Sequence, residues 1–216
     1  KQLKEGERLL RLEQLEQENR HLRTLLEARE RQPVKSTVAE IMYTAKDPFS
    51  RKVILDKGAQ AGIEAGQAVV DDAGVVGQIT RVFPMQSELT LLTDKDQAIP
   101  VMVVRSGLRA VLFGSGDGLM ELRYLAANAD VQPGDKIVTS GLDGVFLAGL
   151  PVATVARVER DQAQTFARIP CLPAAGVERF THVLVLGHRE SLPVRPPDVE
   201  PVVSKLKGRK ARPAKE

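Results

Sequence analysis

Apolar residues near the start of the chain recur with the spacing of a two-stranded coiled coil. From Leu12, steps of three and four residues lead to Leu15, Asn19, Leu22 and Leu26. These positions form an a/d seam, with Leu12, Asn19 and Leu26 at a and the other two leucines at d. Asn19 at an a position favours two strands in register, because one buried asparagine amide tolerates another facing it.

The rest of this segment, residues 1–33, is charged and ends at Pro33. A helix with so narrow an apolar stripe is only marginally stable alone, so the pattern predicts dimerisation through the seam. The alternative is a single amphipathic helix folded back on the body. Gly6 weakens the helix, and upstream of Leu12 the register decays, with Arg8 at the next d position.

After Pro33 the pattern changes to short β-prone runs separated by glycine turns, and this texture continues to about Gly187. Strands that follow one another without intervening helices indicate barrels or sandwiches, and closure of the sheets would remove exposed edges. The expected strands are 38–45, 52–55, 68–70, 75–82, 89–93, 99–104, 109–113, 119–125, 137–139, 150–159, 166–172 and 183–186.

Composition places the whole chain among ordinary soluble globular proteins, with 43% hydrophobic and 27% charged residues. Aromatic residues make up only 4% and tryptophan is absent, so the core must be built from Val, Leu, Ile and Ala. The length of 216 residues allows one large or two small domains.

The net charge of +3 belongs mostly to a Pro-rich tail, residues 191–216, which is expected to be disordered. From 192 onward there are seven basic and three acidic residues, against 24 and 25 in the remainder. Electrostatic contact with an anionic polymer or membrane and a merely solvated tail are both open. A nucleic-acid-binding protein is therefore kept as an alternative, although the tail lacks aromatic residues for base stacking. The candidate contact residues are Lys205, Lys207, Arg209, Lys210 and Arg212.

Catalysis has weak candidates. Ser115 and Ser140 lie in glycine-rich loops, and a β-barrel serine hydrolase is the enzymatic alternative. No nucleophile-elbow pattern surrounds either serine. We expect both serines to belong to turns. We expect the histidines to lie on the surface, and these are His21, His182 and His188.

The sequence predicts no metal or other cofactor. The single cysteine, Cys171, excludes an intrachain disulfide, and the histidines lack metal-ligand spacing. The acidic pairs 71–72 and 94/96 are interpreted as turn formers. No apolar run has the length of a membrane span. Lys1 lies inside a helical pattern without a cap, so we expect a truncated or processed chain whose missing N-terminal part could have been an anchor.

One central stretch is the most distinctive, running from Gly134 to Phe146 as GDKIVTSGLDGVF and followed by GLPV at 149–152. Together with VILDKG at 53–58, LLTD at 91–94 and the motifs RSG and RAVL at 105–112, it resembles the MreC family of rod shape-determining proteins. The resemblance covers about 38–186. Leu147 stands where the family is expected to have proline, and Ala153 where it is expected to have glycine.

The resemblance implies a mainly β fold, in which the coiled-coil helix is followed by two small β-barrel domains. The first would comprise 34–97 plus about 178–190, and the second 98–177. It also implies a non-enzymatic scaffold on the periplasmic side of the bacterial inner membrane, held by a single-pass anchor. Such a scaffold self-associates as dimers, and in some members as filaments.

The partners that the resemblance implies are MreB, MreD, RodA and an elongation-specific penicillin-binding transpeptidase, which the scaffold would position for cell-shape maintenance. Phe146 would be either a core residue of the second barrel or, with Leu147, an exposed contact for assembly or for a partner.

Overall fold

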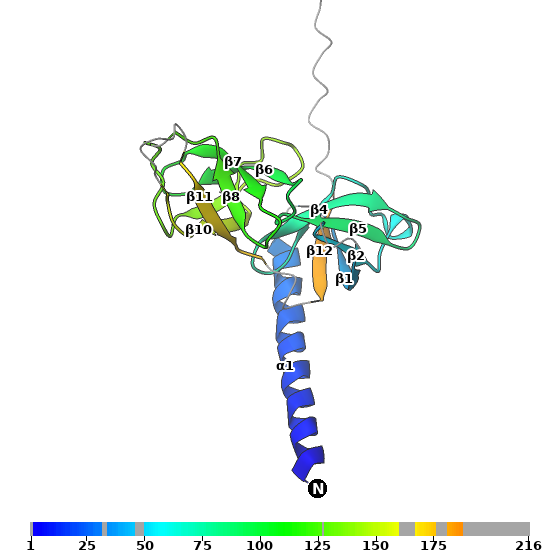
Figure 1. Ribbon diagram of the computed structural model, residues 1–216. Coiled ribbons are helices and arrows are strands. Elements are labelled where there is room, and N and C mark those ends of the chain that lie inside the picture. The colour runs from blue at the N-terminus through cyan, green and yellow to red at the C-terminus, as the bar shows by residue number, and fades with distance from the viewer. Residues whose placement is uncertain are drawn as a thin grey trace, which may run out of the picture.

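The computed structural model describes residues 2–31, 34–45, 50–126, 128–159, 167–175 and 181–187. The chain forms one long helix and two closed six-stranded barrels, which lie beside each other at the C-terminal end of the helix (Figure 1). The predicted fold class, mainly β with one N-terminal helix and two barrels, is confirmed.

Helix α1 spans Gln2–Arg31 and projects from the barrels as a stalk (Figure 1). Its 30 residues correspond to a length of about 45 Å at 1.5 Å per residue. Among the described residues, no helix combines the length and apolar character needed to cross a membrane.

The first barrel closes in the order β1-β12-β3-β4-β5-β2, with every neighbouring pair antiparallel. Its last strand comes from the far end of the described chain and inserts between β1 and β3, pairing Leu184 with Val38 on one side and Val70 on the other. The strands are β1 Ser36–Thr44, β2 Lys52–Leu55, β3 Ala68–Val70, β4 Val75–Val82, β5 Ser87–Leu91 and β12 His182–Leu186.

The second barrel closes in the order β10-β11-β8-β7-β6-β9 and is also antiparallel throughout. Its strands are β6 Ala98–Val103, β7 Arg109–Gly114, β8 Met120–Arg123, β9 Lys136–Thr139, β10 Pro151–Val155 and β11 Ile169–Pro173. The expected strand 150–159 is too long, because regular pairing ends at Val155 and only an isolated bridge joins Glu159 to Arg168.

Alternation along each strand places aliphatic side chains inside the barrels. Leu55, Ile79 and Leu89 are among those that fill the first, and Leu112 and Leu122 among those that fill the second. The apolar core of the second barrel extends beyond the strands of that barrel. It continues through Val70, Val75 and Leu184 of the first barrel to Leu25 of α1, so the helix end and both barrels share one apolar cluster.

Two glycines let the barrels approach each other closely. A Cβ at Gly74, in the turn before β4, would overlap the carbonyl oxygen of Pro151. A Cβ at Gly114, at the end of β7, would overlap the carbonyl oxygen of Asp94. A side chain at Gly74 would push the two barrels apart, and one at Gly114 would push β7 away from the segment that links β5 to β6.

The distinctive stretch 134–146 forms β9 and the turn after it. The Thr139 hydroxyl donates to the Leu147 carbonyl and accepts from the Leu150 amide at 2.9 Å. Asp143 Oδ1 accepts from the amides of Val145 and Phe146, both at 3.1 Å. These bonds turn the Phe146 ring inward, where it is 5% exposed and packs in the shared core.

Candidate assembly interface

The predicted seam lies along an open face of α1. Leu12, Leu15 and Leu26 are each about half exposed, at 51%, 53% and 51%, and Asn19 is exposed as well. Leu22 is half-buried. Apolar side chains that are held in a row and left in solvent form a surface that a second helix could cover.

A different face of α1 docks on the body. His21 is 4% exposed, Leu25 is 1% exposed, and Ala28 packs against the shared core. With 3.6 residues per turn, this face points roughly 120° away from the seam. The body therefore covers Leu22 only in part and leaves Leu26, the next seam residue, about half exposed where the helix contacts the barrels.

His21 lies at the centre of the docked face, so the expectation of a surface position for it is wrong. Its Nε2 is 3.3 Å from the carbonyl oxygen of His182 on β12, and its Nδ1 is 3.5 Å from Asp72 Oδ1 in the β3–β4 turn. The sequence offered one signal for this face, because His21, Leu25 and Ala28 share the i, i+4, i+7 spacing of one helix side.

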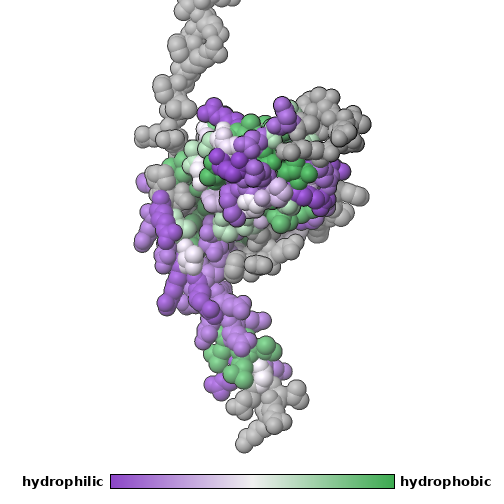
Figure 2. Space-filling model, turned by 90° about the vertical axis from the view of Figure 1, so that its left-hand side faces the viewer, coloured by the Kyte–Doolittle hydropathy of each residue, from purple (hydrophilic) through white to green (hydrophobic). Residues whose placement is uncertain are grey.

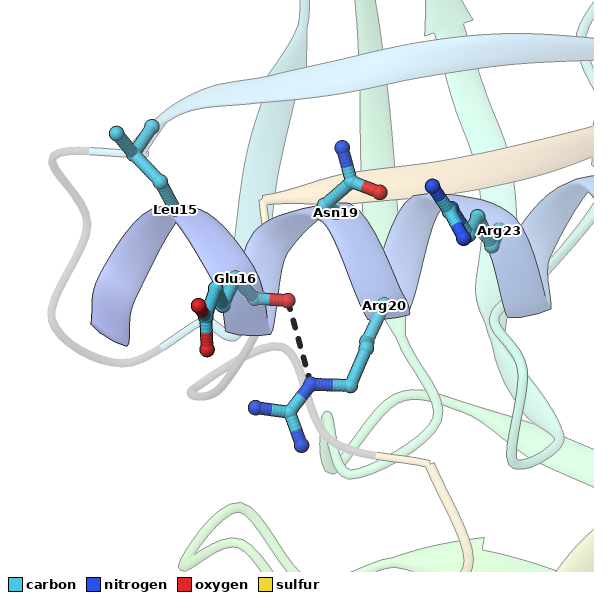
Figure 3. A pocket seen from close by; sticks show the side chains of 5 residues that line it. All are labelled: Leu15, Glu16, Asn19, Arg20 and Arg23. Carbon is cyan, nitrogen blue, oxygen red and sulfur yellow. Dashed lines mark hydrogen bonds between the residues drawn. The ribbon is translucent and has the colours of Figure 1, made fainter. Parts of the chain in front are cut away.

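A shallow hollow opens between side chains of α1 and includes two of the predicted seam residues (Figure 3). It is lined by Leu15, Glu16, Asn19, Arg20 and Arg23. Leu15 and Asn19 project to the same side of the helix, while Arg20 turns back so that its Nε donates to the Glu16 carbonyl at 3.3 Å. The hollow thus combines apolar, amide and charged groups at the level of two successive seam layers.

The apolar surface widens toward the N-terminal end of the stalk. Figure 2 shows hydrophobic side chains gathered there, and the exposed leucines of this part include Leu9 and Leu10, at 58% and 62%. Neither occupies an a or d position of the seam. The helix therefore exposes more apolar surface than a two-stranded seam alone would cover.

Arg51 ties the first barrel to a loop of the second. Its Nε donates to the carbonyl of Gly116 at 2.9 Å, and its backbone amide donates to Asp94 Oδ2 at 2.6 Å. Asp94 is 1% exposed and also accepts from the Asp96 amide at 2.9 Å. The acidic pair 94/96 is thus part of the joint between the barrels, a role that sequence reasoning missed.

A second set of charged side chains forms ion pairs that hold the loop before β9. Arg105 donates through Nε and Nη2 to the two carboxylate oxygens of Asp135, at 2.8 and 3.0 Å, and also pairs with Asp130. Hydrogen bonds from Arg105 hold the pKa of Asp135 below its ordinary value, although burial acts in the opposite direction. The same carboxylates raise the pKa of Arg105.

The candidate catalytic serines make structural hydrogen bonds, Ser115 within its own turn and Ser140 to strand β6. Ser115 donates to the Leu119 carbonyl at 2.8 Å and to Asp117, and Ser140 donates to the Pro100 carbonyl at 3.1 Å. Burial raises the pKa of the Cys171 thiol to about 12, so the reactive thiolate is scarce near neutral pH. Asp71 Oδ1 accepts from the amides of Ala73 and Gly74, both at 2.8 Å, as expected for a turn former.

The family model described as "Rod shape-determining protein MreC, barrel core" matches residues 41–187, which is most of the two-barrel body. The chain belongs to the MreC family. The resemblance read from the sequence motifs is thereby confirmed.

Similarity to individual MreC proteins supports this assignment. The chain is 41% identical over 180 residues to the cell shape-determining protein MreC of Escherichia coli K12, covering 82% of the chain and 49% of that protein. It thus spans about half the length of this curated relative. The crystal structure of MreC from Pseudomonas aeruginosa matches with a TM-score of 0.69 and 42% identity, covering 71% of this chain and 99% of that one.

A more distant MreC structure shares the fold. It belongs to a complex between the penicillin-binding protein PBP2 and MreC from Helicobacter pylori, and it matches with a TM-score of 0.54 at 21% identity. The match covers 71% of this chain and 100% of that one.

Two further site predictions concern Phe146 with Leu147 and the basic residues of the tail. The Phe146 ring is buried and Leu147 is half-buried, which favours the core alternative for Phe146 over the exposed contact. A role of either residue in assembly or partner binding stays a prediction. The basic residues from Lys205 to Arg212, and His188, lie outside the described residues.

Proposed function

We propose that this chain is a non-enzymatic, dimeric scaffold that positions a peptidoglycan transpeptidase for cell-shape maintenance. Dimerisation would run through Leu12, Leu15, Asn19, Leu22 and Leu26. The barrels would contact the transpeptidase and bias it toward one working arrangement, which is a shift in population and not a chemical step.

The observation that carries the proposal is the division of α1 into two faces. One face, with His21 and Leu25, packs against the barrels. The seam of leucines remains about half exposed. Exposed leucines at heptad spacing are costly in water and are stabilised when a partner helix packs on them. Because the C-terminal part of α1 is docked on the barrels, a dimer formed through the helices would also hold the two copies of the barrels in defined positions.

The transpeptidase is supported as partner by the relative from Helicobacter pylori, whose MreC forms a complex with PBP2. We place the barrels on the periplasmic side of the bacterial inner membrane, with MreB, MreD and RodA as further partners. Assembly beyond the dimer into filaments belongs to the same proposal, and a contact of the basic tail with an anionic surface is its least supported part.

The test is direct binding of the 216-residue chain to the periplasmic part of an elongation-specific penicillin-binding transpeptidase, measured by surface plasmon resonance. We expect saturable binding, with no binding to an immobilised unrelated periplasmic protein. Failure to bind this transpeptidase at micromolar concentrations would contradict the scaffold role, whatever the oligomeric state.

A further inference from the structure

Four charged side chains flank the seam of α1. Counting from Asn19 at a, Glu16 and Arg23 occupy e positions, and Arg11 and Glu18 occupy g positions. All four are exposed. Within the described chain, α1 forms its ion pair through other residues, Arg31 with Glu27, and approaches Asp72 through His21, at 3.5 Å.

A parallel, in-register pair of helices would bring these charges together across the seam. In that arrangement each g residue faces the e residue five positions later on the other helix. Arg11 would therefore face Glu16 of a second copy, and Glu18 would face Arg23 of a second copy. Both contacts join opposite charges, and two-fold symmetry repeats each of them, so the flanks of the seam are complementary to themselves.

The same register satisfies the polar residue inside the seam. It sets Asn19 opposite Asn19, where the two amides can hydrogen-bond. An antiparallel pair would set a positions opposite d positions and would bury the Asn19 amide against a leucine. The asparagine inside the seam and the charges beside it are thus two independent features that favour the parallel, in-register pair.

We propose that Arg11, Glu16, Glu18 and Arg23 select a second copy of this chain, parallel and in register, as the occupant of the seam. This inference rests on the proposed dimer and adds what decides its orientation and the choice of partner. Exposed ion pairs contribute little to affinity individually, but repulsive pairs at these positions discriminate against wrong partners.

The test exchanges charges without changing the net charge. The e-swap variant carries Glu16→Arg and Arg23→Glu, and the g-swap variant carries Arg11→Glu and Glu18→Arg. Each variant alone would oppose like charges at all four contacts of a homodimer. A one-to-one mixture of the two variants would restore four attractive contacts, but only in a heterodimer.

Sedimentation equilibrium of the full chain, with a fluorescent label on one variant, measures each species alone and in the mixture. We expect each swap to weaken homodimerisation roughly tenfold to hundredfold, and the mixture to recover wild-type affinity as a heterodimer. The effect should shrink at 1 M salt because exposed charges are screened. A matched control, Glu13→Arg with Arg20→Glu, moves the same charges at b positions and should dimerise like wild type.

The outcomes separate this inference from the proposed function. If both swaps homodimerise like wild type and mix without preference, the charges do not select the partner, although the helix dimer stands. Homodimers that are weakened but not rescued by mixing, in variants with wild-type helical circular dichroism, would contradict the parallel register. A wild-type chain that stays monomeric would overturn both the dimer and the charge pairing.

Discussion

Arg51 Nε lies 2.9 Å from the carbonyl oxygen of Gly116, and this hydrogen bond joins the first barrel to the β7–β8 loop of the second. The backbone of Arg51 is itself held by the buried carboxylate of Asp94. One arginine therefore links three segments and contributes to the joint between the barrels.

Replacing Arg51 by alanine should loosen this joint. Loss of the bond to Gly116 should reduce the free energy of unfolding by about 1 kcal/mol, measured by urea denaturation. Arg157→Ala is a matched control, because among the described residues Arg157 forms its ion pair with the nearby Glu159 on the surface and should change stability little. Equal effects of the two substitutions would show that Arg51 does not act as a joint.

The core position of Phe146 predicts a large loss of stability on truncation. Phe146→Ala should lower the free energy of unfolding by about 3–5 kcal/mol, because it leaves a cavity in the shared core. Leu142→Ala, at a position that is 63% exposed in the same loop, should stay within about 0.5 kcal/mol of wild type. A Phe146→Ala chain of wild-type stability would return Phe146 to the candidates for a surface contact.

Two buried hydroxyls should respond in opposite ways to removal. Thr139→Val leaves the Leu147 carbonyl and the Leu150 amide without their side-chain partner and should cost about 1–3 kcal/mol. Ser87 is 0% exposed, and its hydroxyl has no hydrogen-bond partner among the described residues. Ser87→Ala should therefore be neutral or slightly stabilising. Urea unfolding of both variants checks the pair, and a costly Ser87→Ala would contradict it.

The ion pair of Arg105 with Asp135 predicts a dependence of stability on pH in the acid range. Because the folded pKa of Asp135 lies below its ordinary value of 3.8, its contribution is fully present above that value. The contribution is lost as the pH falls through the folded pKa.

Urea unfolding at a series of pH values measures this slope. Asp135→Asn should flatten the loss of stability below about pH 4, and Arg105→Gln should do the same, with the double variant adding nothing. An acid slope that is unchanged in Asp135→Asn would mean that other carboxylates carry the whole effect.

Local patterns in the sequence predicted the helix and most strand positions, because heptad spacing and glycine turns are properties of short segments. They left barrels or sandwiches open, and the two barrels were expected from the family resemblance. The docked face of α1 escaped prediction because His21 meets its partners only when β12, 161 residues later, enters the first barrel. Arg51 and Gly116, 65 residues apart, likewise become neighbours only through the packing of two barrels. Whether Phe146 faces the core was also open, because its burial depends on segments distant in sequence that form the shared core.

The oligomeric state of the helix seam tests the central claim most directly. Sedimentation equilibrium should show a dimer for the wild-type chain and a monomer for Leu15→Asp with Leu22→Asp, because two aspartates at d positions bury charge in the seam. Circular dichroism should show that the barrels remain folded in both. A double variant that sediments as the same dimer as wild type would contradict the account, because self-association would then run through the barrels.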